Sequence, residues 1–123
     1  MLAQHEPCGD PRYPMADQIK DACLRACNDC AVACLQCAMA SLNEADPKPM
    51  VRCIALDLEC ADICRLAVAS MARGGEHMKA ICALCATACL GCAAECSKHN
   101  MDHCQHCAEA CKRCAEACLA MGN

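Results

Sequence analysis

Cysteines recur along the chain at steps of three and four residues, and charged residues such as Glu109 and Arg113 fall between them. At about 100° per residue, alternating steps of four and three keep each run within one narrow stripe of a helix. A β-strand, whose faces alternate at every residue, would scatter the same cysteines over both faces. The spacing therefore predicts helices with one cysteine-lined face each. The runs are Cys23, Cys27, Cys30, Cys34, Cys37; Cys53, Cys60, Cys64; Cys82, Cys85, Cys89, Cys92, Cys96; and Cys104, Cys107, Cys111, Cys114, Cys118.

Proline, glycine and capping residues divide the chain into four expected helices. Their ranges are 16–43, 47–73, 76–98 and 100–121. Asp46 suits a helix start, Gly74 suits a helix end, and Asn100 is the expected N-cap of the last helix. Because the connections are short, consecutive helices must run antiparallel. We therefore predict an all-α fold, an antiparallel up-down-up-down four-helix bundle with a cysteine-lined core over residues 16–121, after a short irregular N-terminal arm over residues 1–15.

The composition indicates what fills this bundle. The 123 residues include 19 Cys and 25 Ala but no Trp, no Phe and a single Tyr. A domain of this size normally fills its core with branched and aromatic side chains, so the thiols must take their place. So many cysteines exceed any packing need. Disulfides between residues three or four apart on a helix fit the bond geometry poorly, which leaves metal binding as the favoured explanation.

Charge and targeting features exclude several other classes. The net charge of −4 provides no footprint for a nucleic acid. No apolar run reaches 18 residues, so we expect no membrane partner. The first residues lack an apolar segment and a twin arginine, so we expect no export signal and a cytoplasmic location, where thiols stay reduced.

Thiolates are soft ligands that select Cu(I), Zn(II) or iron–sulfur clusters. Iron–sulfur motifs need loop-type spacings that are missing from this sequence. Cu(I) fits best, because residues four apart on a helix can hold it between two sulfurs, and one Cu(I) per thiolate leaves no net charge. Two thiolates per ion would leave a costly negative charge in the core. We therefore expect many Cu(I) ions per chain and no enzymatic activity. The alternatives are a zinc or cadmium thiolate buffer, or a thiol-redox protein, which needs a few exposed, reactive cysteines.

Two motifs are the most specific parts of the sequence: Cys23-x3-Cys27-x2-Cys30-x3-Cys34-x2-Cys37 and Cys104-x2-Cys107-x3-Cys111-x2-Cys114-x3-Cys118. With stripes in all four helices, the chain resembles the cytosolic branch of the bacterial copper storage proteins. The resemblance implies a homotetramer of four-helix bundles, each filled with Cu(I) through Cys-x3-Cys pairs, that serves copper storage and tolerance. A copper chaperone or another Cu(I) donor or acceptor is the expected partner. The segment 47–73 departs from the pattern, since it carries only three cysteines.

Weaker copper ligands gather where the first and third expected helices end. His99, Met101 and His103 are candidate ligands there, in addition to the eighteen cysteines of the stripes. Imidazole and thioether bind Cu(I) more weakly than thiolate does, which suits loading and release. Met50 is a weaker candidate at the same end.

The opposite end carries Met71, Met78 and Met121 in phase with the stripes, and we expect them to form an apolar plug. Asp57 lies in phase with the second stripe, where we expect it to lean toward solvent or a subunit interface. Cys8 lies outside the stripes and is not counted as a ligand.

Overall fold

The computed structural model describes residues 14–122 of the chain. This part of the chain is helical and contains no strand, which confirms the all-α prediction. Its elements are α1 (Pro14–Leu42), the 3-10 helix η3 (Lys48–Met50), α2 (Val51–Arg73), α3 (Met78–Cys96) and α4 (Asp102–Ala120). Most of the predicted N-terminal arm lies outside the described residues.

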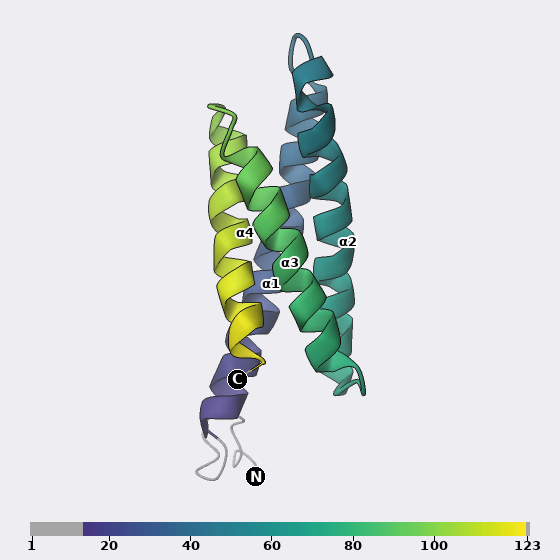
Figure 1. Ribbon diagram of the computed structural model, residues 1–123, viewed down its shortest axis with the longest axis vertical. Helices are drawn as coiled ribbons and strands as arrows, with labels where there is room; N and C mark the ends of the chain where they lie inside the picture. Colours follow the sequence, from purple (N-terminus) through teal and green to yellow (C-terminus); the bar gives the residue numbers. More distant parts are fainter. Residues whose placement is uncertain (1–13, 123) are drawn as a thin grey trace, which may run out of the picture.

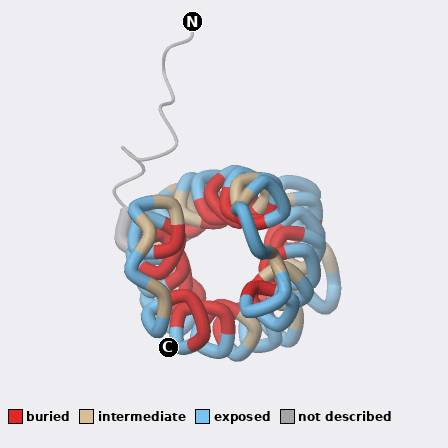
Figure 2. The backbone as a smooth tube through the Cα atoms, turned by 90° about the horizontal axis from the view of Figure 1, so that it is seen from above, coloured by how far each residue is buried: buried red, intermediate tan, exposed pale blue. Residues whose placement is uncertain are grey.

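The four helices form an antiparallel ring in which each packs against the next and α4 returns to α1. Figure 1 shows that the α1–α2 and α3–α4 connections lie at one end, which we call the mouth. The α2–α3 turn, the start of α1 and the end of α4 lie at the other end, which we call the far end. Seen along the bundle, buried residues line the inside of the ring and exposed residues its outside (Figure 2). The predicted up-down-up-down bundle is confirmed.

Most helix ends follow the local chemistry expected from the sequence. Pro14 opens α1, where its missing N–H costs nothing, two residues before the expected start. The Asp46 carboxylate accepts a hydrogen bond from the N–H of Lys48 at 3.2 Å and so supports the start of η3. Gly74 ends α2 in the left-handed conformation, with φ 63° and ψ 46°, as the sequence predicted.

The start of α4 differs from the prediction. The N-cap is Met101, with an extended backbone, and not Asn100. The carbonyl of Met101 accepts the first helical hydrogen bonds, at 3.0 Å from the N–H of Cys104 and 3.1 Å from that of Gln105. The Gln105 side chain also donates to the carbonyl of His99 at 2.6 Å. The Met101 carbonyl and the Gln105 side chain therefore make the hydrogen bonds at the start of α4, where no side chain acts as the N-cap.

Thiols and alanines replace the usual aliphatic core. All eighteen cysteines of residues 14–122 are buried and free of disulfides, and none exposes more than 1% of its surface. Several larger aliphatic side chains point outward, among them Leu58, Leu66, Leu84 and Leu90. The centre of the bundle is therefore filled by polarisable sulfurs, while aliphatic side chains pack around its edge or lie on the surface.

Among the described helices, α3 alone is long and apolar enough to cross a membrane by length and composition. This is weak support for a membrane span, because the core helix of a bundle passes the same test. The apolarity of α3 comes largely from alanines and from five buried cysteines that face the interior.

Candidate metal centre

The stripes of the four helices meet in one continuous tube of sulfur atoms. Between helices, the Sγ atoms of Cys53 and Cys96 lie 3.5 Å apart, and those of Cys27 and Cys114 also lie 3.5 Å apart. Within a helix, the Sγ atoms of Cys30 and Cys34 lie 3.9 Å apart. Most thiols are therefore in contact with a thiol of a neighbouring helix, and many also with one of their own helix.

These distances suit soft metal ions with several coordination numbers. For metal–sulfur bonds of about 2.3 Å, the edge between two sulfurs is about 3.8 Å in a tetrahedral site, about 4.0 Å in a trigonal site and about 4.6 Å in a linear one. Six of the seven pairs four residues apart have Sγ–Sγ distances of 3.9–4.0 Å. They match three-coordinate Cu(I) as they stand, and a linear ion needs a small rotation of the side chains.

Sets of four sulfurs also converge between helices. Three sets that share no member have all their sulfurs within 4.8 Å of one another: Cys27, Cys85, Cys114, Cys118; Cys30, Cys60, Cys64, Cys89; and Cys34, Cys92, Cys107, Cys111. Each set draws on three helices, and all twelve residues are buried. The other six thiols lie toward the two ends of the tube. Geometry alone would allow either zinc or a copper–thiolate cluster in each set.

Burial opposes the loss of a proton from these thiols when no metal is bound. It raises the pKa of Cys82, at the far end, to about 11 and the pKa of Cys104, at the mouth, to about 12. These two thiols are therefore protonated at physiological pH, which avoids the cost of a buried charge. A metal ion that binds must displace these protons.

Asp57 lies inside the tube, which corrects our expectation that it leans toward solvent or an interface. Its side chain is fully buried. Its Oδ1 accepts hydrogen bonds from the thiols of Cys92 at 3.1 Å and Cys107 at 3.3 Å. Burial, followed by the nearby thiols, raises the pKa of Asp57 to about 11. The carboxyl group is therefore neutral, and a neutral acid fits among thiols where a carboxylate would not.

His103 is the predicted ligand that the structure brings into contact with sulfur. Its Nδ1 lies 3.4 Å from Sγ of Cys37 and 3.5 Å from Sγ of Cys104. Its Nε2 lies 3.0 Å from the Glu44 carboxylate, which can only accept, so Nε2 carries the hydrogen and Nδ1 faces the thiols. Burial opposes protonation, but the hydrogen bonds with Cys37 and Glu44 outweigh it and raise the pKa of His103.

His99 lies at the same end but faces a carboxylate. Its Nε2–H donates to Glu95 at 3.1 Å, and Glu95 also pairs with Arg52 and Lys98, each at 3.3 Å. The hydrogen bond from His99, with Lys98 as a further contributor, lowers the pKa of Glu95. Sequence reasoning missed Glu44 and Glu95, because neither is in phase with a cysteine stripe. The signal that could have found Glu95 is its position four residues before His99.

The methionines divide between the two ends. At the mouth, Met50 is buried and Met101 is partly buried against the cysteine core. At the far end, Met71 is fully buried, whereas Met78 and Met121 line a cavity. Cys8 lies outside the described residues.

A helical bundle with a continuous, buried lining of thiols defines a class of protein, in which the interior is one large binding site for soft metal ions. The sequence profile of the copper storage proteins matches residues 16–123. The chain belongs to the copper storage protein family.

Individual relatives agree with this assignment. An uncharacterised cysteine-rich protein, YhjQ of Bacillus subtilis, is 50% identical over 73 residues, which cover 59% of this chain and 68% of that protein. The Cu(I)-bound copper storage protein BsCsp3 is 50% identical, with a TM-score of 0.83 over 86% of this chain and 100% of that one. A cytosolic copper storage protein from Streptomyces lividans, solved with five coppers, is 35% identical, with a TM-score of 0.83 over 85% of this chain and 92% of that one.

Proposed function

We propose that this protein stores Cu(I), with many ions per chain held by the thiolates of its core. The observation that carries the proposal is the tube of eighteen buried, unpaired cysteines with neighbouring Sγ atoms 3.5–4.0 Å apart. Solved relatives described as Cu(I)-bound or copper-loaded support the choice of ion.

Charge favours Cu(I) over zinc as the stored ion. A zinc ion with four thiolates has a net charge of −2, and several such sites in one core would need buried counter-charges. The described core contains no lysine or arginine side chain. One Cu(I) per thiolate is neutral, so the tube can fill without accumulating charge. We therefore expect the capacity to approach the number of thiols.

Copper is taken up at the mouth in this proposal. His103 presents Nδ1 next to Cys37 and Cys104, so an arriving ion meets one nitrogen and two sulfurs. Met101 and His99 are further proposed ligands at this end. The ion then moves inward by ligand exchange between adjacent thiols, and one proton leaves for each thiolate that forms. The eighteen cysteines named from the sequence are the proposed storage ligands.

The setting of the protein is also part of the proposal. We infer a cytoplasmic store, supported by the relative described as cytosolic, that exchanges Cu(I) with a copper chaperone or another donor or acceptor. Exposed leucines on α2 and α3, such as Leu58 and Leu84, are suited to contacts between copies of the chain, and we propose a homotetramer. Light scattering coupled to gel filtration measures the mass of the assembly.

The decisive experiment is an anaerobic titration of the reduced, metal-free protein with Cu(I) in competition with a strong Cu(I) chelator, repeated with Zn(II). We expect tight binding that approaches one Cu(I) per buried thiol, eighteen in the described chain. Far-UV circular dichroism should barely change, because the thiols already pack together without metal. The role of His103 in uptake is tested with His103→Ala. Its matched control is His106→Ala, an exposed position on α4, which should load copper like the wild type.

Two results would contradict the proposal. Saturation at about four Cu(I) ions, or displacement of Cu(I) by zinc, would favour the zinc or cadmium thiolate buffer with four sulfurs per ion. One or two highly reactive cysteines in a thiol-labelling profile would favour the thiol-redox protein.

A further inference from the structure

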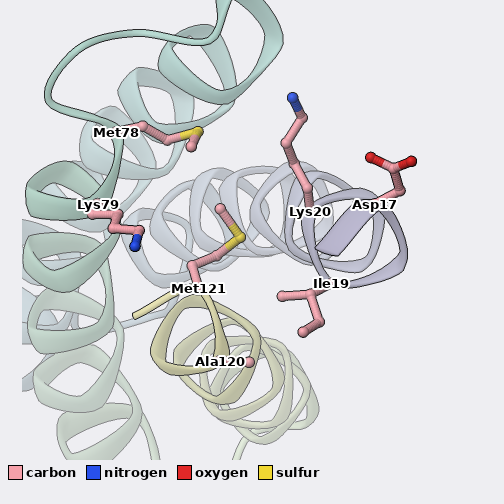
Figure 3. A pocket seen from close by; sticks show the side chains of 7 residues that line it. All are labelled: Asp17, Ile19, Lys20, Met78, Lys79, Ala120 and Met121. Atoms are coloured by element: carbon pink, nitrogen blue, oxygen red, sulfur yellow. The ribbon is translucent and has the colours of Figure 1, made fainter. Parts of the chain in front are cut away.

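The far end of the bundle contains a cavity of about 340 Å³ between the start of α1, the start of α3 and the end of α4. Figure 3 shows the side chains of Met78 and Met121 directed into the same space, with Lys20 and Asp17 on the α1 side and Lys79 on the α3 side. Ile19 and Ala120 complete the lining. The cavity thus combines apolar walls, two thioethers and charged groups, which a simple apolar plug would not.

The floor of this cavity is the layer next to the sulfur tube. Ile19, Met78 and Met121 each lie three or four residues, about one helical turn, beyond the terminal cysteine of their own helix. Two of those cysteines, Cys23 and Cys118, have Sγ atoms 3.6 Å apart. A single helical turn therefore separates the cavity from the last thiols of the proposed store.

Thioethers are suited to pass Cu(I) across this layer. They are soft ligands without charge, so they bind Cu(I) but release it more easily than a thiolate does. Met78 is partly buried and Met121 is 9% exposed, whereas Met71 is fully buried nearby. Met78 and Met121 can therefore reach both the cavity and the tube, while Met71 serves as packing.

The charges around the cavity select the form in which copper crosses it. Among the described residues, neither Lys20 nor Lys79 forms an ion pair with a carboxylate. With Asp17, the lining has two positive charges and one negative. This balance repels a bare copper cation and attracts an anionic ligand that carries copper.

We propose that the far end is a second exchange port, at which an anionic low-molecular-weight thiol binds to Lys20 and Lys79 and withdraws Cu(I) through Met78 and Met121. The inference rests on the proposed storage function and adds a route of release to it. In the exchange, the sulfur of the incoming thiol binds Cu(I) and the released cysteine thiolate takes the proton of that thiol. Copper remains Cu(I) throughout, so no oxidant or reductant is needed.

The test compares two thiols on the full-length, Cu(I)-loaded protein without oxygen. Glutathione is the anionic probe and dithiothreitol the uncharged one, and an excess of a strong Cu(I) chelator records the copper released, with chelator alone as the blank. Lys20→Glu with Lys79→Glu should slow the glutathione-driven release about tenfold, since electrostatic attraction changes association by that order. The same variant should leave the dithiothreitol-driven release within about twofold of the wild type, because no charge is involved.

Two further variants complete the design. Met78→Leu with Met121→Leu should slow release to both thiols, because leucine fills the same space without a ligand atom. Lys112→Glu with Arg113→Glu makes the same change of charge on the exposed outer face of α4 and should alter neither rate.

The outcomes test the proposed exchange port separately from the proposed storage function. Equal effects of the Lys20 and Lys79 variant on both thiols, or the same effect from the control at Lys112 and Arg113, would overturn the port. The copper content of each loaded sample is measured first, so a low capacity in the wild type would count against the storage function itself. Circular dichroism of each variant shows whether a slow release reflects a misfolded bundle.

Discussion

Replacement of Asp57 by asparagine should stabilise the reduced, metal-free protein, and this gain should grow as the pH rises. Asp57 is fully buried and is hydrogen-bonded by the thiols of Cys92 and Cys107. Asparagine has nearly the same shape and hydrogen-bonding capacity but cannot ionise. The substitution therefore isolates the cost of keeping this carboxyl group protonated.

The size of the effect follows from the difference between the pKa of Asp57 in the folded state and in the unfolded state. In the folded protein the pKa of Asp57 is raised to about 11, first by burial, whereas an aspartate in an unfolded chain titrates near 3.9. Between these values the folded state holds a proton that the unfolded state has lost. The stability from this group is fully present below the unfolded pKa and is lost at about 1.4 kcal/mol per pH unit as the pH rises toward the folded pKa. The stability difference between the variant and the wild type should then grow by about 4 kcal/mol from pH 5 to pH 8.

The assay is urea denaturation of both proteins at pH 5, 6, 7 and 8, anaerobic and with a reductant, followed by far-UV circular dichroism. The buried thiols are the same in both proteins, so their titration cancels in the difference. Asp62→Asn removes an exposed carboxylate from the same helix and serves as the control. A difference between wild type and Asp57→Asn that stays constant from pH 5 to pH 8 would show that Asp57 is ionised in the folded core, and the reasoning would be refuted.

The other predictions concern two residues at the mouth and two glycines. His103→Ala should slow Cu(I) loading in anaerobic stopped-flow mixing without lowering the final capacity, and a loss of several equivalents would contradict a role in uptake alone. Glu44→Ala should slow loading about tenfold, because outer groups that orient a histidine ligand have effects of that size, whereas Glu44→Gln keeps an acceptor for Nε2–H and should restore the rate. Gly74→Ala should cost about 1 kcal/mol in thermal unfolding, because Gly74 has a φ of 63°, while Gly91→Ala, in open space on α3, should stabilise by about 0.5–1 kcal/mol.

The bundle could be predicted because its pattern is both periodic and chemically uniform. Steps of three and four residues fix which face of each helix turns inward, and short connections fix the directions of the helices. The start of α4 was placed one residue early because Asn100 is a good cap in isolation. The backbone of Met101 and the side chain of Gln105 hold this turn instead, and these contacts depend on the fold.

The polar residues of the site were harder to predict. The period predicts Asp57 in the stripe, but a carboxylate is normally kept out of a core. Burial, followed by the thiol neighbours, makes the neutral form of the carboxyl group favourable. His99 and His103 are both candidate ligands in the sequence, and His99 is the favoured one because it is in phase with Cys92 and Cys96. The structure separates them, because His99, just after α3, is hydrogen-bonded to Glu95, whereas His103 is hydrogen-bonded to Glu44, from the connection after α1, and has its Nδ1 next to two thiols.

The spacing of the sulfurs limits how a partner protein could detect the number of Cu(I) ions bound in the tube. Sulfurs 3.9–4.0 Å apart already stand at the edge length of a three-coordinate Cu(I) site, so the helices need hardly move as ions arrive. We therefore expect the outer surface to keep the same shape whether the tube is empty, half full or full. A partner cannot recognise the fill level by shape, and can sense it only through how readily the next ion is accepted or surrendered at the ends.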